Sequence, residues 1–163
     1  MTRATSASRW FAAVALVSFA AVVAALISQH GFDMQPCPWC VLQRAIFIAM
    51  ALAGLIGSLC HAAAGRLIAG GLVLALALAG VAAAMWQHFQ AAASASCNLT
   101  LADKIITALK LDSLLPSVFL ATANCADAAV NLLGVPYDFW SLSLFALLAL
   151  AAVRAVTGSS PRS

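Results

Sequence analysis

Two of the five cysteines stand three positions apart in the motif Cys37-Pro38-Trp39-Cys40. Cysteines at this spacing reach each other easily, so the pair can form and break a disulfide. A long apolar run begins directly after Cys40, and the N-terminus of a helix stabilises a thiolate at the nearest cysteine. Arg44 follows four positions later, on the same face of such a helix. We interpret Arg44 as a cation that stabilises the Cys40 thiolate and donates hydrogen bonds to a ligand carbonyl; the alternative is an interfacial arginine that reaches lipid phosphate.

The composition shows which solvent surrounds these residues. The chain has 163 residues, of which 64% are hydrophobic and 8% charged, and its mean hydropathy is +1.03. A soluble domain carries about 25% charged residues, so this chain cannot cover a soluble globule with polar side chains. A lipid bilayer removes that requirement. The net charge of +3 is small and scattered, which argues against a nucleic-acid surface.

Four apolar runs can cross a bilayer, at residues 10–27, 41–59, 67–86 and 139–153. Roughly 20 helical residues span the hydrocarbon core, and backbone amides in lipid must be paired within the segment, so each run should be a helix. We predict one all-α domain, an integral membrane four-helix bundle with helices at about residues 10–28, 41–60, 67–88 and 138–156. The first run is longer than the ~7–15 apolar residues of a signal peptide, so it is expected to be retained.

The basic residues predict how the bundle is oriented. Cytoplasmic loops carry an excess of Lys and Arg. With the N-terminus in the cytoplasm, every arginine outside the second run falls on that side: Arg3, Arg9, Arg66, Arg154 and Arg162. Lys104, Lys110 and all five acidic residues then lie on the other side. Both termini are therefore expected in the cytoplasm, and residues 29–40 and 89–137 form the outer loops.

This orientation separates the cysteines into two groups. Cys37, Cys40, Cys97 and Cys125 fall on the outer side, whereas Cys60 lies alone at the cytoplasmic end of the second helix. Disulfides persist in the bacterial periplasm and are kept reduced in the cytosol. Two potential pairs thus lie where disulfides can exist. Because the orientation was assigned without the cysteines, their separation supports it independently. No role is assigned to Cys60.

The long outer loop contains a segment with helical periodicity. Residues 99–115 place apolar side chains near one helical face, namely Leu101, Ile105, Ile106, Leu109 and Leu115. The charged residues of the segment lie elsewhere on the helix. This pattern predicts a short amphipathic helix on the outer membrane surface, with an ordinary packed loop helix as the alternative.

The Cys-x-x-Cys motif has other interpretations. Cys97 and Cys125 could complete a four-thiolate zinc site, but structural zinc sites usually bring a second closely spaced pair, and these two are far apart. Val41 stands where a haem-attachment motif has histidine. Purely structural disulfides would leave Arg44 and the motif's place at the membrane edge unexplained. We therefore favour redox exchange and expect no metal.

The same residues carry a resemblance to the DsbB family of bacterial disulfide-bond-formation membrane proteins. Residues 36–44, Pro-Cys-Pro-Trp-Cys-Val-Leu-Gln-Arg, follow that family's Cys-x-x-Cys-x-x-x-Arg pattern at the start of the second helix. Looser matches are Cys97, residues 116–125, Leu133-Gly134 and Trp140-Ser141-Leu142. The resemblance covers nearly the whole chain, including the number of spans and the loop lengths.

The resemblance implies a location and a role for each outer cysteine. The protein would lie in the bacterial inner membrane, and Cys97 and Cys125 would form a periplasmic disulfide that accepts electrons from a DsbA-like thiol oxidase, with Cys97 as the sulfur attacked. Cys37 would exchange with Cys125 and release the Cys40 thiolate. Cys40 would then reduce ubiquinone or menaquinone bound beside Arg44. Exchange of this kind proceeds by thiolate attack through mixed disulfides.

Two regions depart from the family pattern. The segment Thr122-Ala123-Asn124 lacks the glycine and the acidic residue expected before the second loop cysteine. The family's quinone-linked histidine near the outer end of the third helix aligns with Ala83, and His88 stands nearby. His88 is kept as a candidate quinone contact, with an interfacial histidine at a helix end as the alternative.

Two competing classes remain. A vitamin-K-epoxide-reductase-like enzyme would use similar chemistry, but its loop cysteines precede the Cys-x-x-Cys motif, whereas here the motif comes first. A non-catalytic membrane protein, either a transporter or an assembly factor, could carry structural disulfides in its outer loops. The four apolar runs contain no carboxylate, and intramembrane carboxylates often mark ion paths, so a transporter is disfavoured.

Overall fold

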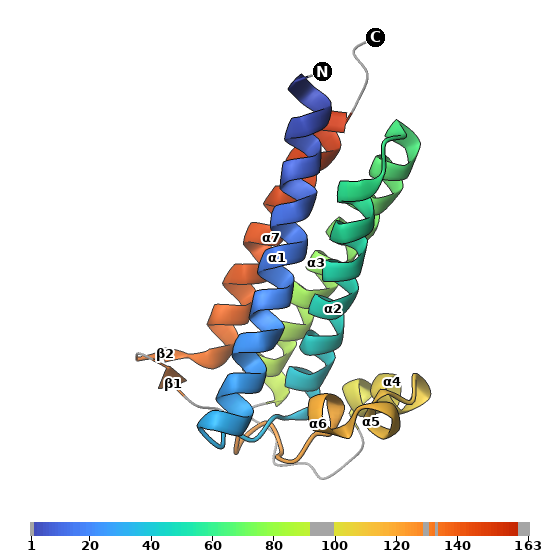
Figure 1. Ribbon diagram of the computed structural model, residues 1–163. Helices are drawn as coiled ribbons and strands as arrows, with labels where there is room; N and C mark the ends of the chain where they lie inside the picture. The colour runs from blue at the N-terminus through green and yellow to red at the C-terminus, as the bar shows by residue number, and fades with distance from the viewer. Residues whose placement is uncertain (1, 92–99, 129–130, 133, 160–163) are drawn as a thin grey trace.

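Four long helices form the body of the protein. The computed structural model describes residues 2–91, 100–128, 131–132 and 134–159. The long helices are α1 (Thr2–Gly31), α2 (Pro38–Leu59), α3 (Ala63–Trp86) and α7 (Tyr137–Ser159) (Figure 1). Each contains a segment long and apolar enough to cross a membrane. The structure confirms the predicted all-α bundle of a multi-pass membrane protein.

The helices surround a shared core in the order α1, α2, α3, α7. Helix α1 packs against α2 and α7, and α3 packs against the same two neighbours. The start of α1 and the end of α7 lie together at one end of the bundle, and the short helices and the small hairpin lie at the other (Figure 1). We call the second region the loop end; it contains residues 32–37 and the described part of residues 100–136.

The helices differ from the predicted ranges mainly at their ends. Helix α1 begins at Thr2 rather than near residue 10, and α3 begins at Ala63 rather than at 67. Apolar content marks the part of a helix that lipid surrounds, whereas backbone hydrogen bonding continues through polar flanking residues. Helix α2 begins at Pro38, because proline at the first helical position loses no hydrogen bond. Cys40 therefore lies inside the first turn of α2.

Helix α3 continues into a wider turn that the sequence did not predict. Residues Gln87–Ala91 form a short π-helix, η1. Turns of this kind are rare and occur often at functional sites. Here the wider turn carries Gln87 and His88, whose side chains reach α2 and α7.

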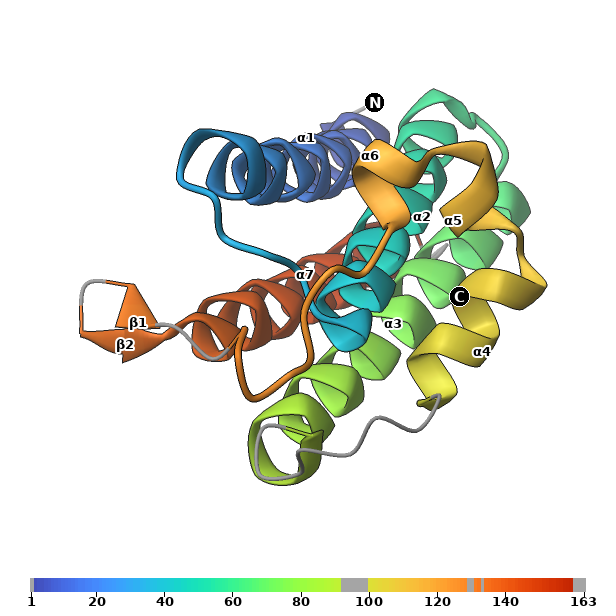
Figure 2. The same cartoon turned by 90° about the horizontal axis from the view of Figure 1, so that it is seen from below.

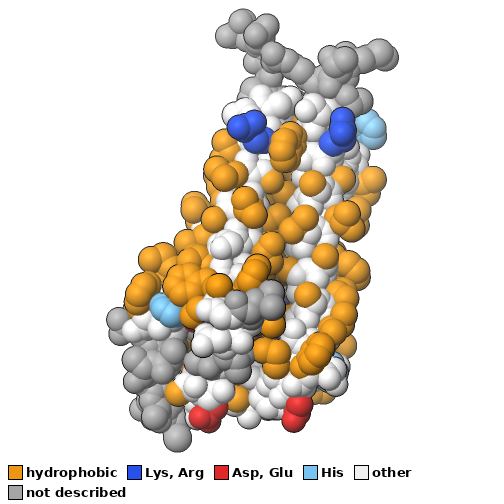
Figure 3. Space-filling model, turned by 90° about the vertical axis from the view of Figure 1, so that its left-hand side faces the viewer, with side chains coloured by type: hydrophobic (Ala, Val, Ile, Leu, Met, Phe, Trp, Pro, Cys, Tyr) orange, Lys and Arg blue, Asp and Glu red, His pale blue; other side chains and the backbone are white. Residues whose placement is uncertain are grey.

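Aromatic stacking fills the middle of the bundle, while the outer faces stay apolar. The rings of Phe47 and Phe145 stack with centroids 4.1 Å apart. Large side chains such as Leu16, Ile68 and Leu150 point outward and are at least 64% exposed. Orange hydrophobic side chains cover much of the face between the basic end and the acidic end (Figure 3). Such a surface would be costly in water and suits lipid.

Glycines let the helices approach one another closely. A Cβ atom on Gly54 would lie 2.9 Å from the backbone nitrogen of Ala15 and 3.0 Å from the carbonyl oxygen of Phe11. These are backbone atoms of α1, so they cannot move unless the helix moves. By contrast, a Cβ on Gly71 would meet nothing within 4 Å. Small residues at a helix–helix contact are typical of membrane bundles.

We expect Gly54→Ala to lower the free energy of unfolding by roughly 1–3 kcal/mol, because the added methyl forces α1 and α2 apart. Gly71→Ala is the matched control and should lose no stability. Reversible unfolding in mixed detergent micelles, followed by circular dichroism, measures both. Equal stability of the two variants would contradict the close approach of α1 and α2.

The loop end contains three short helices, α4 (Leu101–Ala108), α5 (Leu111–Leu114) and α6 (Pro116–Phe119) (Figure 2). The predicted single helix over residues 99–115 is thus divided, because Lys110 takes the left-handed conformation with φ 55°. Leu99 lies outside the described residues. Ala102 and Ile106 of α4 pack under the start of α2 with Trp39 and Val41. That these helices lie on the membrane surface stays a prediction.

A small antiparallel hairpin leads into α7. Strands β1 (Asn131–Leu132) and β2 (Val135–Pro136) pair Leu132 with Val135, and Gly134 in the turn has φ +81°. A positive φ of this size favours glycine. The indole nitrogen of Trp140 donates to the carbonyl of Leu132 at 3.3 Å, which ties the hairpin to the first turn of α7.

Candidate redox site

Three of the four predicted redox cysteines meet at the loop end. The sulfur atoms of Cys37 and Cys40 are 2.9 Å apart. The Cys37 side chain is also hydrogen-bonded to that of Cys125. Cys37 is fully buried between the other two, and all three are free thiols here. Cys97 lies outside the described residues, so its predicted pairing with Cys125 stays a prediction.

The segment before Cys125 is fastened to the chain just before the Cys-x-x-Cys motif. The backbone N–H of Thr122 donates to the carbonyl of Pro36 at 3.0 Å, and its hydroxyl donates to Gln35 Oε1 at 2.6 Å. Asn124 Oδ1 accepts from the backbone N–H of Asp127 at 2.9 Å, which closes a turn around the cysteine. These are residues of the segment that departs from the family pattern. Thus this segment uses other polar groups to hold Cys125 against Cys37.

The two thiols at the contact between the loops differ in their readiness to ionise. The hydrogen bond from Cys37 lowers the pKa of Cys125, with a smaller contribution from a backbone hydrogen bond at Trp39. The pKa of Cys37 is raised, first by its hydrogen bond with Cys125, then by that with Cys40, and then by burial. Cys125 therefore ionises more readily than Cys37, which is the hydrogen-bond donor of the pair. Since the thiolate is the attacking species in thiol–disulfide exchange, Cys125 is the better nucleophile of these two thiols.

We expect Cys37→Ala to move the pH midpoint of Cys125 alkylation upward in the reduced protein. The lowered pKa keeps Cys125 ionised at a pH where an ordinary thiol is protonated, and removal of the Cys37 donor withdraws that stabilisation. Iodoacetamide labelling across a pH series, read by peptide mass spectrometry, gives the midpoint. Cys60→Ala at the far end of α2 is the control and should leave it unchanged. A midpoint that does not move in Cys37→Ala would refute the assignment of the thiolate.

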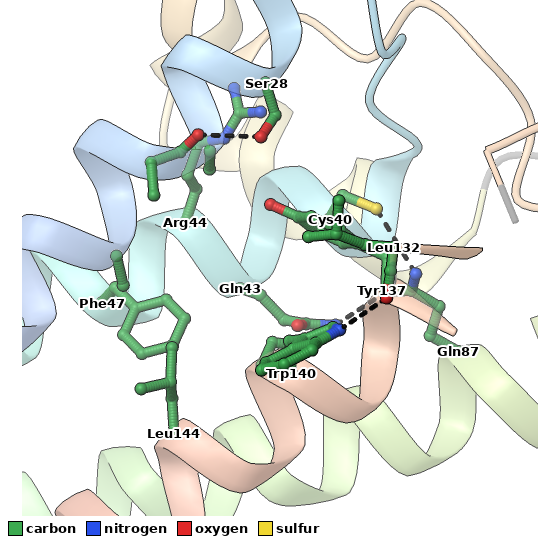
Figure 4. Close-up of a pocket in the computed structure, with 14 residues that line it drawn as sticks. Ser28, Cys40, Gln43, Arg44, Phe47, Gln87, Leu132, Tyr137, Trp140 and Leu144 are labelled. Carbon is green, nitrogen blue, oxygen red and sulfur yellow. Dashed lines mark hydrogen bonds between the residues drawn. The ribbon is translucent and has the colours of Figure 1, made fainter. Parts of the chain in front are cut away.

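A cavity of about 200 Å³ lies beside Cys40 (Figure 4). Its walls come from α1, α2, α7, the hairpin and Gln87. Most of the lining is apolar and includes Ala21, Phe47 and Leu144. A few polar side chains also line it, among them Ser28, Gln43, Arg44, Tyr137 and Ser141. An apolar cavity with a few polar groups is the usual form of a small-molecule site.

Arg44 is buried and lines this cavity with Cys40. One terminal nitrogen of its guanidinium donates to Gln29 Oε1 at 2.7 Å and to the carbonyl of Val118 at 2.8 Å. The side chain thus links α1, α2 and the α6 segment. Among the described residues, no carboxylate forms an ion pair with it. A buried cation with only neutral partners can still stabilise negative charge on the neighbouring sulfur or on a ligand oxygen.

A second hollow of about 390 Å³ lies on the loop side of the same two residues. It shares Ser28, Cys40, Arg44 and Tyr137 with the first cavity, and its other walls include Phe32, Pro36 and Asp127. Cys40 and Arg44 therefore separate an apolar cavity within the bundle from a more polar hollow at the loop end. A reacting sulfur in this position is accessible both to the outer loops and to an apolar ligand.

His88 does not line either hollow. Its Nδ1 lies 2.9 Å from Asp138 Oδ2, so it is connected to the site through a carboxylate. Direct contact between His88 and a quinone stays a prediction. Sequence reasoning missed Gln43, Gln87 and Tyr137. Gln43 carried a detectable signal, since it is a polar side chain within an apolar run next to Arg44.

The described residues contain no group of three or more His, Cys, Asp or Glu side chains arranged to hold a metal ion. The three neighbouring thiols, the buried Arg44 and the apolar cavity are the arrangement expected of a membrane-embedded thiol–disulfide oxidoreductase. The family model described as "Disulfide bond formation protein DsbB" matches residues 7–155. The chain belongs to the DsbB family.

Curated relatives agree with this assignment over nearly their full lengths. Disulfide bond formation protein B of Ralstonia nicotianae is 33% identical over 148 residues, which cover 90% of this chain and 92% of the relative. The protein of the same name from Cupriavidus metallidurans is 32% identical over 142 residues, covering 86% and 87%. Disulfide bond formation protein B 2 of Burkholderia lata is 35% identical over 152 residues, covering 91% and 88%. The chain is thus a disulfide-bond-forming membrane oxidoreductase by family.

Proposed function

We propose that this protein reoxidises a DsbA-like periplasmic thiol oxidase and passes the electrons to membrane quinone. The observation that carries the proposal is the order of the sulfur atoms. Cys37 contacts both Cys125 and Cys40, and Cys40 shares an apolar cavity with Arg44. This order suits electrons that enter at the outer loop and leave inside the membrane.

In the proposed cycle, each thiolate attack forms one disulfide bond and breaks another. A thiolate of the partner attacks Cys97 in a Cys97–Cys125 disulfide, forms a mixed disulfide and releases the Cys125 thiolate. Cys125 then attacks Cys37 in a Cys37–Cys40 disulfide, so the Cys37–Cys40 bond breaks and the charge moves to Cys40. This attack leaves a Cys37–Cys125 disulfide. The partner's second thiol attacks the mixed disulfide and releases the Cys97 thiolate, which attacks Cys125, restores the Cys97–Cys125 bond and frees Cys37. The Cys37–Cys40 disulfide would re-form as the two electrons pass to the quinone. Overall, the dithiol loses two electrons and two protons, and the quinone gains both to become a quinol.

The cavity beside Cys40 is proposed as the site for the quinone ring. Its alanine, leucine and phenylalanine walls suit an apolar ring, and the guanidinium of Arg44 suits a carbonyl that gains negative charge. Either ubiquinone or menaquinone satisfies this chemistry. The quinone supplies the oxidising potential, while Cys40 supplies the electrons.

We further propose that the protein lies in the bacterial inner membrane with both termini in the cytoplasm and the active cysteines facing the periplasm. The positions of the charges support this orientation. On the face that Figure 3 shows, Lys and Arg side chains lie at the end opposite the loop end, and acidic side chains lie at the loop end. The excess of basic residues is expected on the cytoplasmic side.

We expect purified protein in detergent to reduce a water-soluble ubiquinone analogue when a reduced DsbA-like protein is added. Cys40→Ser should abolish this reduction, because no sulfur then lies beside the cavity. Cys60→Ser is the matched control and should retain full activity. The ultraviolet absorbance of the quinone follows the reaction. If neither a ubiquinone nor a menaquinone analogue is reduced with several dithiol donors, the disulfides are structural and the protein is non-catalytic.

We expect Arg44→Lys to raise the KM for the quinone analogue roughly tenfold, about the contribution of one hydrogen bond to a charged group. The KM for the dithiol protein should stay unchanged, because that partner reacts at the outer loop. Steady-state kinetics with each substrate varied separately measures the two constants. Gln29→Ala removes an Arg44 partner but not the cation, so it should have the smaller effect. A change confined to the dithiol KM would place Arg44 outside the quinone site.

A further inference from the structure

A buried polar cluster adjoins Cys40 where η1, α2 and α7 meet. It consists of Gln43, Gln87, Asp138 and the more exposed His88. Gln87 and Asp138 are only 4% and 6% exposed. Polar groups buried at the membrane end of a bundle cost free energy unless each has a partner. The hydrogen bonds among these groups determine which way the side-chain amide of Gln87 points.

The amide of Gln87 has a partner for each of its polar atoms. Its Oε1 accepts a hydrogen bond from Gln43 Nε2 at 2.7 Å. Its Nε2 lies 3.4 Å from the sulfur of Cys40 (Figure 4). The same nitrogen lies 3.4 Å from Asp138 Oδ1. An ionised carboxylate only accepts hydrogen bonds, so Asp138 requires the nitrogen rather than the oxygen on its side. The second N–H of the same nitrogen is then available to the sulfur.

Asp138 is itself held by His88. The imidazole Nδ1 lies 2.9 Å from Asp138 Oδ2. The other carboxylate oxygen, Oδ1, is the one that faces Gln87. The ring of His88 is fixed between Phe89 and Phe139, with centroids 5.0 and 4.6 Å away. Because its side chain is 32% exposed, the imidazole connects the buried carboxylate to the surface. The contacts therefore form a chain from His88 through Asp138 and Gln87 to Cys40.

We propose that Gln87 is a catalytic hydrogen-bond donor to the Cys40 thiolate, and that Asp138 and His88 are positioning residues that orient its amide. This inference rests on the proposed function, because the exchange step is what leaves negative charge on Cys40. A hydrogen bond to an ionised acceptor is stronger than one to a neutral acceptor. The amide is already oriented before that charge forms, so it stabilises the charged state without rearrangement.

The decisive experiment measures the thiolate fraction of Cys40 without any quinone. The other four cysteines are replaced by alanine in the full chain, and iodoacetamide alkylation is followed at pH 7 and on the high-pH plateau. The ratio of the two rates reports the ionised fraction and cancels changes in access. Gln87→Met, of similar length but without N–H, should lower this ratio roughly tenfold. Gln87→Glu, which has no N–H when ionised, should lower it at least as far. Ser143→Ala, at an exposed serine of α7 that lines neither hollow, should leave it unchanged.

The positioning role of Asp138 is tested by whether Asp138→Asn raises or lowers the alkylation ratio of Cys40. If the carboxylate acted only through its charge, Asp138→Asn would remove a repulsion and raise the thiolate fraction. If Asp138 orients Gln87, Asp138→Asn should lower the ratio, and should no longer do so when Gln87→Met is also present. Unchanged ratios in both Gln87 variants, with unfolding midpoints like that of the parent, would overturn the proposal.

The two proposals fail in distinguishable ways. Should the protein reduce no quinone, the alkylation ratios still report whether Gln87 stabilises the Cys40 thiolate. With the four catalytic cysteines intact, Gln87→Met should lower the kcat of quinone reduction roughly tenfold and leave the KM for the dithiol protein unchanged. A change in that KM alone would indicate a merely structural effect on the outer loops and would overturn the catalytic role.

Discussion

The contact between Cys37 and Cys125 is the interaction on which the rest of the site depends. It joins two outer loops that are remote in sequence, and it does so at a fully buried sulfur. The backbone bonds from Thr122 and Ala123 to the carbonyl of Pro36 hold the loops in register around it. Without this fastening, Cys125 would be one sulfur on a long loop, and attack on Cys37 would pay the entropy of closing that loop. Fixing the geometry in advance removes that cost from each exchange.

Arg44 connects this loop contact to the interior of the bundle. Its bonds to Gln29 and to the carbonyl of Val118 mean that the cation beside the cavity also holds the end of α1 and the α6 segment. A displacement of the loop that carries Cys125 would therefore disturb the wall of the cavity. Burial of an arginine with neutral partners costs free energy. Arg44 offsets this cost because it joins the loop end to the bundle and also places a cation beside the cavity.

The sequence was sufficient for the features set by composition and short spacing. Low charge and apolar runs predicted the four helices, and the Cys-x-x-Cys motif with Arg44 predicted the side of α2 that faces the site. The break at Lys110 was not predictable, because a single left-handed residue leaves apolar periodicity almost intact. Gln87 and Asp138 were missed for another reason. They lie in different segments of the chain, and only the packing of η1 against α2 and α7 brings them to Cys40.

The packing of η1 against α2 and α7 also explains how a charged sulfur and an apolar cavity can lie side by side in one bundle. In the proposed mechanism Cys40 carries negative charge while it lies next to an apolar cavity, and burial alone disfavours charge. The N-terminus of α2, Arg44 one turn further along the same helix, and the amide of Gln87 in η1 surround the sulfur, and each supplies positive charge or an N–H. Asp138 is separated from the sulfur by that amide and is hydrogen-bonded to His88 through its other carboxylate oxygen. In the proposed mechanism the thiolate is thus stabilised by fixed groups rather than by water, so the cavity can hold an apolar acceptor.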